Sequence, residues 1–286
     1  MPFPAPKPTI LLVHGSWHTP DIYAPLLQTL NARGFETHCP QLPTASPEYL
    51  LLDPANPSRD QPPPPDGHPV QTADAEVLVA ILFQLVEEES KQVLVVAHSS
   101  GGWSSNEAIL PAYQCPVRQK AGKSGGVLGI FCISALLCPP GESVLSTMLS
   151  ALSSSRLDTD LAKVFTFHPH GISTVKNPAD SFFHDLVEQG RMREVDEYSH
   201  MLSACPTLTT GPTNDAMSDV RVGYLVCESD RVLPAKAQES MIRGLEERRG
   251  KEVARYRCEG GHECFLAYTE VVARQIEKFV GPCLET

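Results

Sequence analysis

The fold is decided by the stretch Val93-Leu94-Val95-Val96-Ala97-His98-Ser99-Ser100-Gly101-Gly102, in which an apolar run stops at a tight turn that carries a serine. The run predicts a buried strand. A serine on a sharp strand-to-helix turn projects its hydroxyl at the edge of a sheet when the residues two before and two after it are small. Ala97 and Gly101 meet this condition. The pattern favours a nucleophile elbow at Ser99, although an ordinary strand-to-helix turn has similar residues.

The composition argues against several classes of protein. The chain has 286 residues and a formal net charge of -11, so it offers no basic surface to nucleic acid or to an anionic membrane. Its first eight residues are too rich in proline for a secretory signal, and the apolar run at 9–13 is too short to span a bilayer. Nine scattered cysteines suit reduced thiols better than a disulfide framework. We therefore expect a cytoplasmic protein without nucleic-acid or membrane partners.

Strands and helices alternate around the opening stretch. Two features interrupt the pattern, a proline-rich excursion at 40–70 and a basic loop with Arg118, Lys120 and Lys123. We interpret the excursion as a surface insertion, or alternatively as a segment that shapes the entrance to a site. The predicted strands lie at 9–13, 36–39, 92–96 and 127–133, and the predicted helices at 19–34, 73–90 and 102–110.

The alternation stops after the fourth strand and resumes near residue 219. Residues 135–218 contain helix-like patches and no clear strand, which favours a helical cap inserted into the core. Repeated strand-helix units indicate an α/β fold with a mostly parallel sheet flanked by helices. We predict one domain, with a core of 1–134 and 219–286 and a cap at about 135–218. The later strands are expected at 221–227 and 253–257, and the later helices at 234–245 and 265–280.

The ends of the last two predicted strands carry an acid and a histidine. A serine hydroxyl needs a base to take its proton, and that base needs a carboxylate to orient it. Asp230 follows one strand and His262 follows the next, and the carboxyl ends of parallel strands meet at one edge of a sheet. We predict Ser99 as nucleophile, His262 as base and Asp230 as orienting acid. Glu228 is the alternative acid, and Asp230 is alternatively a helix cap.

An acyl-transfer site also needs two donors for the oxyanion. The N–H after the nucleophile, from Ser100, is one candidate, and the N–H of Ser16, in the loop after the first strand, is the other. We predict that these two amides form the oxyanion hole. His14 is expected to shape its loop rather than act as the base. The residues predicted to line the substrate pocket are Gly15, Trp17, His18 and His98.

No cofactor and no metal are expected. His168, His170 and His184 have a spacing that matches no metal site, so a solvated surface is the better interpretation. The cysteines that bracket the acid and the base are interpreted as buried, inert thiols, with a redox effect as the alternative. They are Cys227, Cys258 and Cys264.

The motifs together resemble the α/β-hydrolase superfamily, specifically the small-cap branch with plant methyl-ester hydrolases and hydroxynitrile lyases. They are His14-Gly15-Ser16-Trp17, Ala97-His98-Ser99-Ser100-Gly101, Asp230 before Pro234, and Gly261-His262 before Phe265-Leu266. The resemblance covers nearly the whole chain and implies the serine, acid, histidine order found here. The segment Phe183-His184-Asp185-Leu186 is similar to the lid of that branch, and fungal hydrolases of natural-product metabolism have similar sequences.

The resemblance also separates the candidate activities. Hydroxynitrile lyases of this branch have a threonine three residues before the His-Gly pair and a lysine directly after the histidine. This chain has Leu11 and Glu263 there, which favours hydrolysis. We therefore expect a serine hydrolase that cleaves a carboxylic ester, thioester or lactone of a small apolar molecule. A lyase or cyclase without an acyl-enzyme, or a ligand-binding receptor, are the alternatives, because fold alone does not choose among them.

Overall fold

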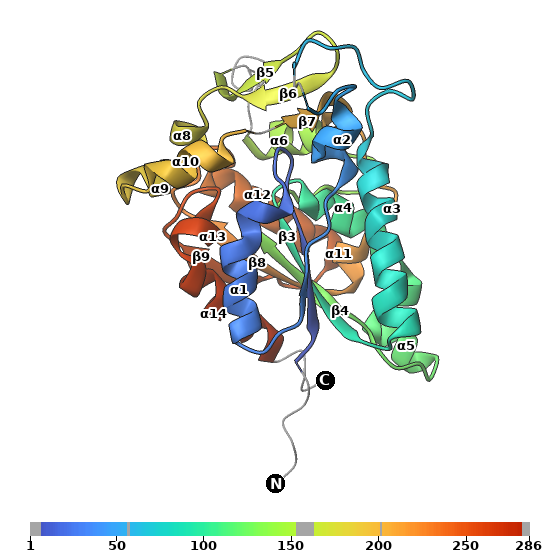
Figure 1. The fold of residues 1–286 in the computed structure, drawn as a ribbon. Helices are drawn as coiled ribbons and strands as arrows, with labels where there is room; N and C mark the ends of the chain where they lie inside the picture. The colour runs from blue at the N-terminus through green and yellow to red at the C-terminus, as the bar shows by residue number, and fades with distance from the viewer. Residues whose placement is uncertain (1–6, 56–57, 153–162, 201, 282–286) are drawn as a thin grey trace.

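Six parallel strands form the central sheet, in the order β2-β1-β3-β4-β8-β9. The structure is a computed structural model that describes residues 7–55, 58–152, 163–200 and 202–281 (Figure 1). The inner strands are buried along almost their whole length, as expected for a parallel sheet covered on both faces. The strands are β1 (Thr9–Val13), β2 (Thr37–His38), β3 (Gln92–His98), β4 (Gly126–Ile133), β8 (Arg221–Cys227) and β9 (Ala254–Cys258).

Two groups of helices enclose the sheet. Helix α1 (Ala24–Ala32) packs against α14 (Thr269–Val280), whereas α3 (Gln71–Leu82) packs against α4 (Gly101–Ala108), with the sheet between the groups (Figure 1). A 3₁₀ turn, Pro20–Tyr23, precedes α1, and a π-helical turn, Phe83–Glu88, follows α3. The other core helices are the 3₁₀ turn Pro111–Tyr113, α5 (Cys115–Lys120), α11 (Ala216–Asp219), α12 (Ala235–Arg249) and α13 (Cys264–Ala267). The predicted α/β fold with a mostly parallel sheet is confirmed.

Part of the expected basic loop is helical: α5 contains Arg118 and Lys120, with Pro116 in its first turn, whereas Lys123 lies beyond the helix. Arg118 is buried rather than solvated. Its guanidinium donates to the backbone carbonyls of Val86 and Ser124 and pairs with the Glu87 carboxylate. This side chain therefore joins α5 to the π-helical turn Phe83–Glu88 that follows α3, and it is buried rather than part of the surface.

The segment between β4 and β8 lies over the carboxyl end of the sheet (Figure 1). It contains a three-stranded antiparallel sheet, β5-β6-β7, in addition to helices. The expectation that this segment has no strand was wrong, because strands of three or four residues are too short to show an alternating pattern. Its elements are α6 (Val144–Leu152), β5 (Phe165–Phe167), β6 (Ile172–Val175), α8 (Pro178–Ser181), α9 (His184–Glu188), α10 (Met192–Tyr198), β7 (Leu202–Ala204) and the 3₁₀ turn Cys205–Leu208.

The proline-rich segment at 40–70 contains a 3₁₀ turn, Pro43–Ala45, and the short helix α2 (Pro47–Leu50). Leu50 and Leu51 share a small apolar cluster with Ile172 of β6 and Ala204 of β7. The His68 Nε2–H also donates to the backbone carbonyl of His170, at 2.8 Å. The segment thus packs against the small sheet, and its apolar anchors hold it beside the carboxyl end of the central sheet.

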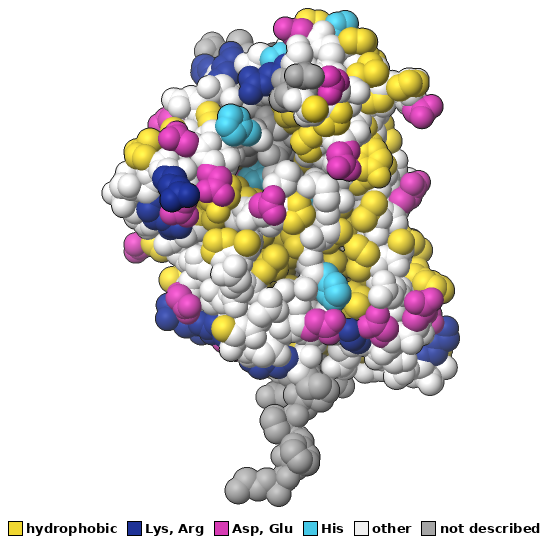
Figure 2. All heavy atoms as spheres, in the orientation of Figure 1, with side chains coloured by type: hydrophobic (Ala, Val, Ile, Leu, Met, Phe, Trp, Pro, Cys, Tyr) yellow, Lys and Arg dark blue, Asp and Glu magenta, His cyan; other side chains and the backbone are white. Residues whose placement is uncertain are grey.

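On the face drawn in Figure 2, lysine and arginine side chains are scattered among aspartate and glutamate, without a continuous basic area. The cysteines in the described part of the chain are free. Within that part, no helix combines the length and the apolar character that a membrane span requires.

The packing of α14 on the sheet gives a test of the core. Phe279 is fully buried, and a Cβ atom at Gly223 of β8 would lie 2.7 Å from its ring. Phe279→Ala should therefore lower the free energy of unfolding by about 3 to 5 kcal/mol, measured by urea denaturation. Phe83 is 49% exposed, so Phe83→Ala should change it by less than about 0.5 kcal/mol. Equal unfolding midpoints for the two variants would contradict this assignment of the core.

Candidate active site

Ser99 lies on the turn between β3 and α4 and has a φ of 52°. This is the left-handed backbone region, which residues other than glycine rarely adopt. The turn packs closely against the end of β1. A Cβ atom at Gly101 would lie 2.4 Å from the carbonyl oxygen of Val13, and one at Gly15 would lie 2.8 Å from the Cβ of Ser99. Both positions therefore require glycine. The local geometry is that of a nucleophile elbow.

Three distant points of the chain meet in one hydrogen-bonded line. The Ser99 hydroxyl lies 3.0 Å from His262 Nε2, and His262 Nδ1 lies 2.7 Å from Asp230 Oδ2. Asp230 and His262 are 5% and 1% exposed, so the line is shielded from water behind the serine. Glu228 lies at the surface and pairs with Arg257 at 2.9 Å, away from the imidazole. The geometry therefore supports Asp230 rather than Glu228 as the orienting acid.

The Asp230 carboxylate is held by several donors. Its Oδ1 accepts the backbone N–H groups of Val232 and Leu233, at 2.8 and 2.7 Å. Its Oδ2 accepts the Ser134 hydroxyl and, at 3.4 Å, the side-chain amide of Gln238, in addition to the imidazole. A buried carboxylate whose lone pairs are occupied by fixed donors keeps its orientation.

The loop that carries His262 is fixed from two sides. The backbone carbonyl of His262 accepts the Nε2–H of His98, at 3.1 Å. The Gly261 N–H donates to the Asp185 carboxylate of α9, at 2.6 Å. A Cβ atom at Gly261 would lie 2.3 Å from the His184 ring, so only glycine lets α9 approach this closely. The imidazole position therefore depends on contacts from β3 and from α9.

The charges around the base favour its protonated form. Burial lowers the pKa of the His262 imidazole, but the Asp230 carboxylate raises it by its charge and its hydrogen bond, and the Glu263 carboxylate raises it further. As a result, the pKa of His262 lies above its ordinary value of about 6.5. A base of this kind is neutral and able to accept a proton only at pH values above that raised pKa.

The two residues whose backbone amides are the predicted oxyanion donors are in contact with each other through the Ser100 side chain. The Ser16 N–H donates to the hydroxyl oxygen of Ser100 at 2.7 Å, and the two hydroxyl oxygens lie 2.8 Å apart. The Ser100 hydroxyl thus lies at the distance from the Ser16 amide that an oxyanion would take. In this arrangement the Ser16 amide is occupied, and it becomes available only when the Ser100 side chain turns.

The histidines near the elbow have structural hydrogen bonds. His14 Nε2 accepts the N–H of Leu42, at 2.9 Å, and burial lowers the pKa of His14 to about 4. His98 Nδ1 accepts the Tyr23 hydroxyl, at 2.7 Å, and burial holds the pKa of His98 well below its ordinary value. Both rings are therefore neutral and hold loops together, as expected for His14.

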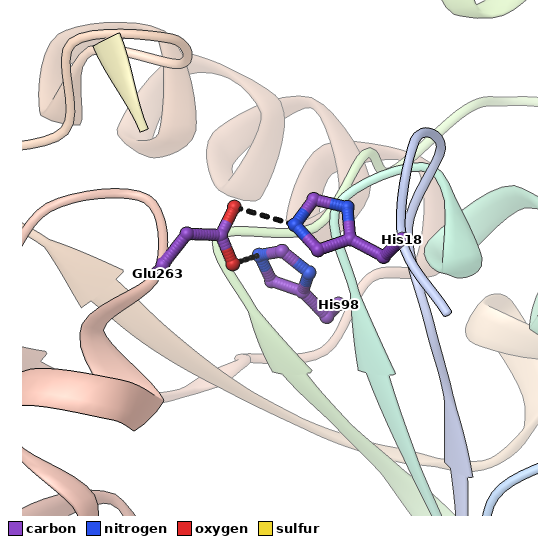
Figure 3. Close-up of side chains that lie close together, drawn as sticks. All are labelled: His18, His98 and Glu263. Carbon is purple, nitrogen blue, oxygen red and sulfur yellow. Dashed lines mark ion pairs between the residues drawn. The ribbon is translucent and has the colours of Figure 1, made fainter. Parts of the chain in front are cut away.

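His18, His98 and Glu263 form a buried group whose nitrogen and oxygen atoms lie within 4.8 Å of one another (Figure 3). His18 Nε2 lies 2.9 Å from one oxygen of the Glu263 carboxylate, and His98 Nε2 lies 3.8 Å from the other. The first distance is that of an ion pair, but the two groups are not aligned for a hydrogen bond. His98 uses both ring nitrogens, toward Tyr23 and His262, and has no nitrogen left for a metal. The group therefore fits a histidine–glutamate pair better than a three-ligand metal centre.

The other histidines considered for a metal site have other contacts. The His168 ring bonds to Thr174 at 3.0 Å, and His184 packs against Gly261. They belong to β5–β6 and to α9 and have no shared ligand position among the described residues.

A narrow apolar pocket opens beside Ser99, with a volume of about 30 Å³. Trp17 lines it, whereas Gly15, His18 and His98 lie outside its wall. The Trp17 indole stacks on Phe165, with 4.3 Å between ring centroids, and donates to the Ser173 hydroxyl at 3.1 Å. The lining residues are Ser16, Trp17, Ser99, Ser100, Leu136, Val144, Met148, Phe165, Leu208, Val232, Leu233 and His262.

Three side chains around the base were not identified in the sequence analysis as part of the site. Ser134 directly follows β4, so its position at a strand end was the available signal, and Glu263 directly follows His262 in the sequence. Gln238 lies inside α12, where nothing in the local pattern distinguishes it from a solvated residue.

Comparisons with known proteins extend over the whole fold. A family described as the alpha/beta hydrolase family matches residues 10–275. "Alpha/beta hydrolase nvfD" from Aspergillus novofumigatus is 24% identical over 98% of this chain and 99% of its own. "Probable hydrolase R7" from a Phoma species is 26% identical over 90% of this chain and 91% of its own.

Solved structures show the same architecture. A polyneuridine aldehyde esterase variant superposes with a TM-score of 0.66 at 17% identity, over 95% of this chain and 98% of its own. At that identity the likeness establishes the fold. Because the family match covers most of the sequence, the chain belongs to the alpha/beta hydrolase family.

Proposed function

We propose that the protein is a serine hydrolase that cleaves a carboxylic ester, thioester or lactone of a small, apolar molecule through an acyl-enzyme on Ser99. The observation that carries the proposal is the buried line from Ser99 through His262 to Asp230, which opens on an apolar pocket. The family supports a hydrolase, and one structural neighbour is named as an esterase.

In the first step, the Ser99 oxygen attacks the substrate carbonyl while His262 Nε2 takes the hydroxyl proton. The Asp230 carboxylate keeps the other ring nitrogen protonated and stabilises the imidazolium that forms. The carbonyl oxygen becomes an oxyanion, for which the Ser16 and Ser100 amides are the donors. This requires the Ser100 hydroxyl to leave the Ser16 N–H, so the arriving oxyanion replaces it.

In the second step, His262 returns the proton to the leaving alcohol, thiol or lactone oxygen, and the carbonyl–leaving-group bond breaks. Water then attacks the acyl-enzyme, with the same imidazole as base, and releases the acid and Ser99. In this proposal the segment at 135–218 is a cap, because Val144, Met148 and Phe165 supply part of the pocket wall.

The pocket lining supports a neutral, apolar substrate. Among the residues that the structure describes, none that lines the pocket is Asp, Glu, Lys or Arg. A charged group buried there would lose its hydration without gaining a partner, at a cost of several kcal/mol.

Replacement of the nucleophile tests the acyl-enzyme. Ser99→Ala should lower kcat for 4-nitrophenyl butyrate at least about a thousand-fold, because the attacking oxygen is lost. A fluorophosphonate probe should label wild type at Ser99, identified by peptide mass spectrometry. Ser90→Ala is the matched control, since Ser90 has a similar φ of 55° before the same strand, and it should react like wild type. A wild type that neither hydrolyses the ester nor takes the label would favour a receptor or a lyase.

The charge beside the base predicts the pH dependence. Because His262 must be neutral to accept the Ser99 proton, kcat/KM should fall as the pH drops through a pKa above 6.5. Glu263→Gln removes one of the negative charges that raise this pKa, so the acid limb should move to lower pH. Glu228→Gln removes a surface carboxylate paired with Arg257 and should leave the limb in place. The same limb in all three proteins would refute the electrostatic assignment.

A further inference from the structure

Two serines in the left-handed backbone region face the same imidazole. Ser99 follows β3 with a φ of 52°, and Ser134 follows the adjacent strand β4 with a φ of 41°. The Ser99 hydroxyl contacts His262 Nε2, and the Ser134 hydroxyl lies 3.4 Å from Nδ1 on the opposite side of the ring. The proposed chemistry uses Ser99 and gives Ser134 no role.

Ser134 contacts the acid more closely than the base. Its hydroxyl donates to Asp230 Oδ2, the same oxygen that accepts the His262 Nδ1–H. Ser134 is fully buried, and its N–H is held by the carbonyl of Leu225 at 3.2 Å. The hydroxyl therefore does not exchange its partner for water, and it is fixed between β4 and β8.

The backbone at this position favours glycine over serine. A residue other than glycine is strained in the left-handed region, and such strain concentrates at functional sites. The chain nevertheless has a serine here, at the point where its hydroxyl completes the donors around Asp230.

We propose that Ser134 is a positioning residue of the catalytic group, whose hydroxyl fixes Asp230 Oδ2 in line with the base and limits how strongly this oxygen attracts the imidazole proton. The proposal rests on the proposed serine hydrolase. Ser134 touches neither the pocket nor the reacting atoms, so it acts through Asp230.

The direction in which Ser134 changes the titration of His262 follows from the sharing of Asp230 Oδ2 by two donors, the Ser134 hydroxyl and the His262 Nδ1–H. Each donor withdraws negative charge from Oδ2, so the hydrogen bond to His262 is weaker than it would be alone. Without the hydroxyl, more charge remains for the imidazolium, which is stabilised. The base then needs a higher pH to become neutral, and the carboxylate has more freedom to turn away from it.

The other groups around the imidazole are unchanged by this substitution. They are Asp230 after β8, Glu263 on the same loop, His98 at the end of β3, with a ring centroid 4.9 Å away, and Asp185 of α9, which holds the Gly261 N–H. A shift in the titration of His262 on removal of the hydroxyl therefore reports the Ser134 contact.

Two substitutions at Ser134 separate the hydroxyl from the backbone strain. Ser134→Ala removes the hydroxyl and keeps the strain, whereas Ser134→Gly removes both. Both variants should move the acid limb of kcat/KM for 4-nitrophenyl butyrate upward by about 0.5 to 1 pH unit and lower kcat about tenfold, as for one lost charge-assisted hydrogen bond. Ser90→Ala and Ser90→Gly, at a similar φ of 55°, are the controls and should leave the limb unchanged.

A second readout does not depend on turnover. The NMR titration of ring-labelled histidine, with His262 assigned by its loss in His262→Ala, should show a higher midpoint in both Ser134 variants than in wild type. Unchanged or lowered midpoints in the NMR titration would overturn the proposal. If wild type has no esterase activity, the proposed function fails, while the titration still decides whether Ser134 acts on the base. Should Ser134→Ala not fold, the unstrained glycine variant supplies the test.

Discussion

The site depends on the parallel register of the central strands. Val13, Ala97 and Cys132 are aligned across β1, β3 and β4, so the loops that follow these strands leave the sheet at the same level. His262, however, follows β9, which lies three strand positions from β3 and Ser99 in the sheet, a span of about 14 Å at the usual spacing. His262 bridges that span because its loop folds back over the intervening strands. The acid after β8 and Ser134 after β4 lie in between.

Burial gives this arrangement its chemistry. Asp230 and His262 are almost without contact with water, so their hydrogen bond is not exchanged for solvent, and every remaining lone pair of the carboxylate has a protein donor. The left-handed backbone at Ser99 and the close approach of Gly101 to β1 then bring the nucleophile to the imidazole. The strained turn at Ser99, the fully hydrogen-bonded Asp230 carboxylate and the buried His262 imidazole therefore belong to one arrangement.

Much of this architecture could be predicted from the sequence, because apolar runs and strand-end motifs are local signals. The core strands, and the positions of Ser99, Asp230 and His262 at the ends of three of them, are of this kind. The small sheet β5-β6-β7 was not predicted, because its strands are too short to show an alternating pattern. Helix α5 was not predicted either, because its charged residues resemble those of a loop. Contacts such as Ser134 with Asp230, or the Ser100 hydroxyl on the Ser16 amide, join residues 84 or more positions apart. No local pattern records them.

The contact between α9 and the base loop links two parts of the molecule that the chain order separates. Asp185 holds the amide of Gly261, and His184 fills the space beside it, so the peptide directly before His262 is held by α9, in the segment between β4 and β8. If α9 shifts outward, the imidazole loses one of its two backbone supports. A substitution on α9 that displaces Asp185 or His184 would therefore reach the His262 imidazole through the Gly261 amide, across 76 positions of the chain.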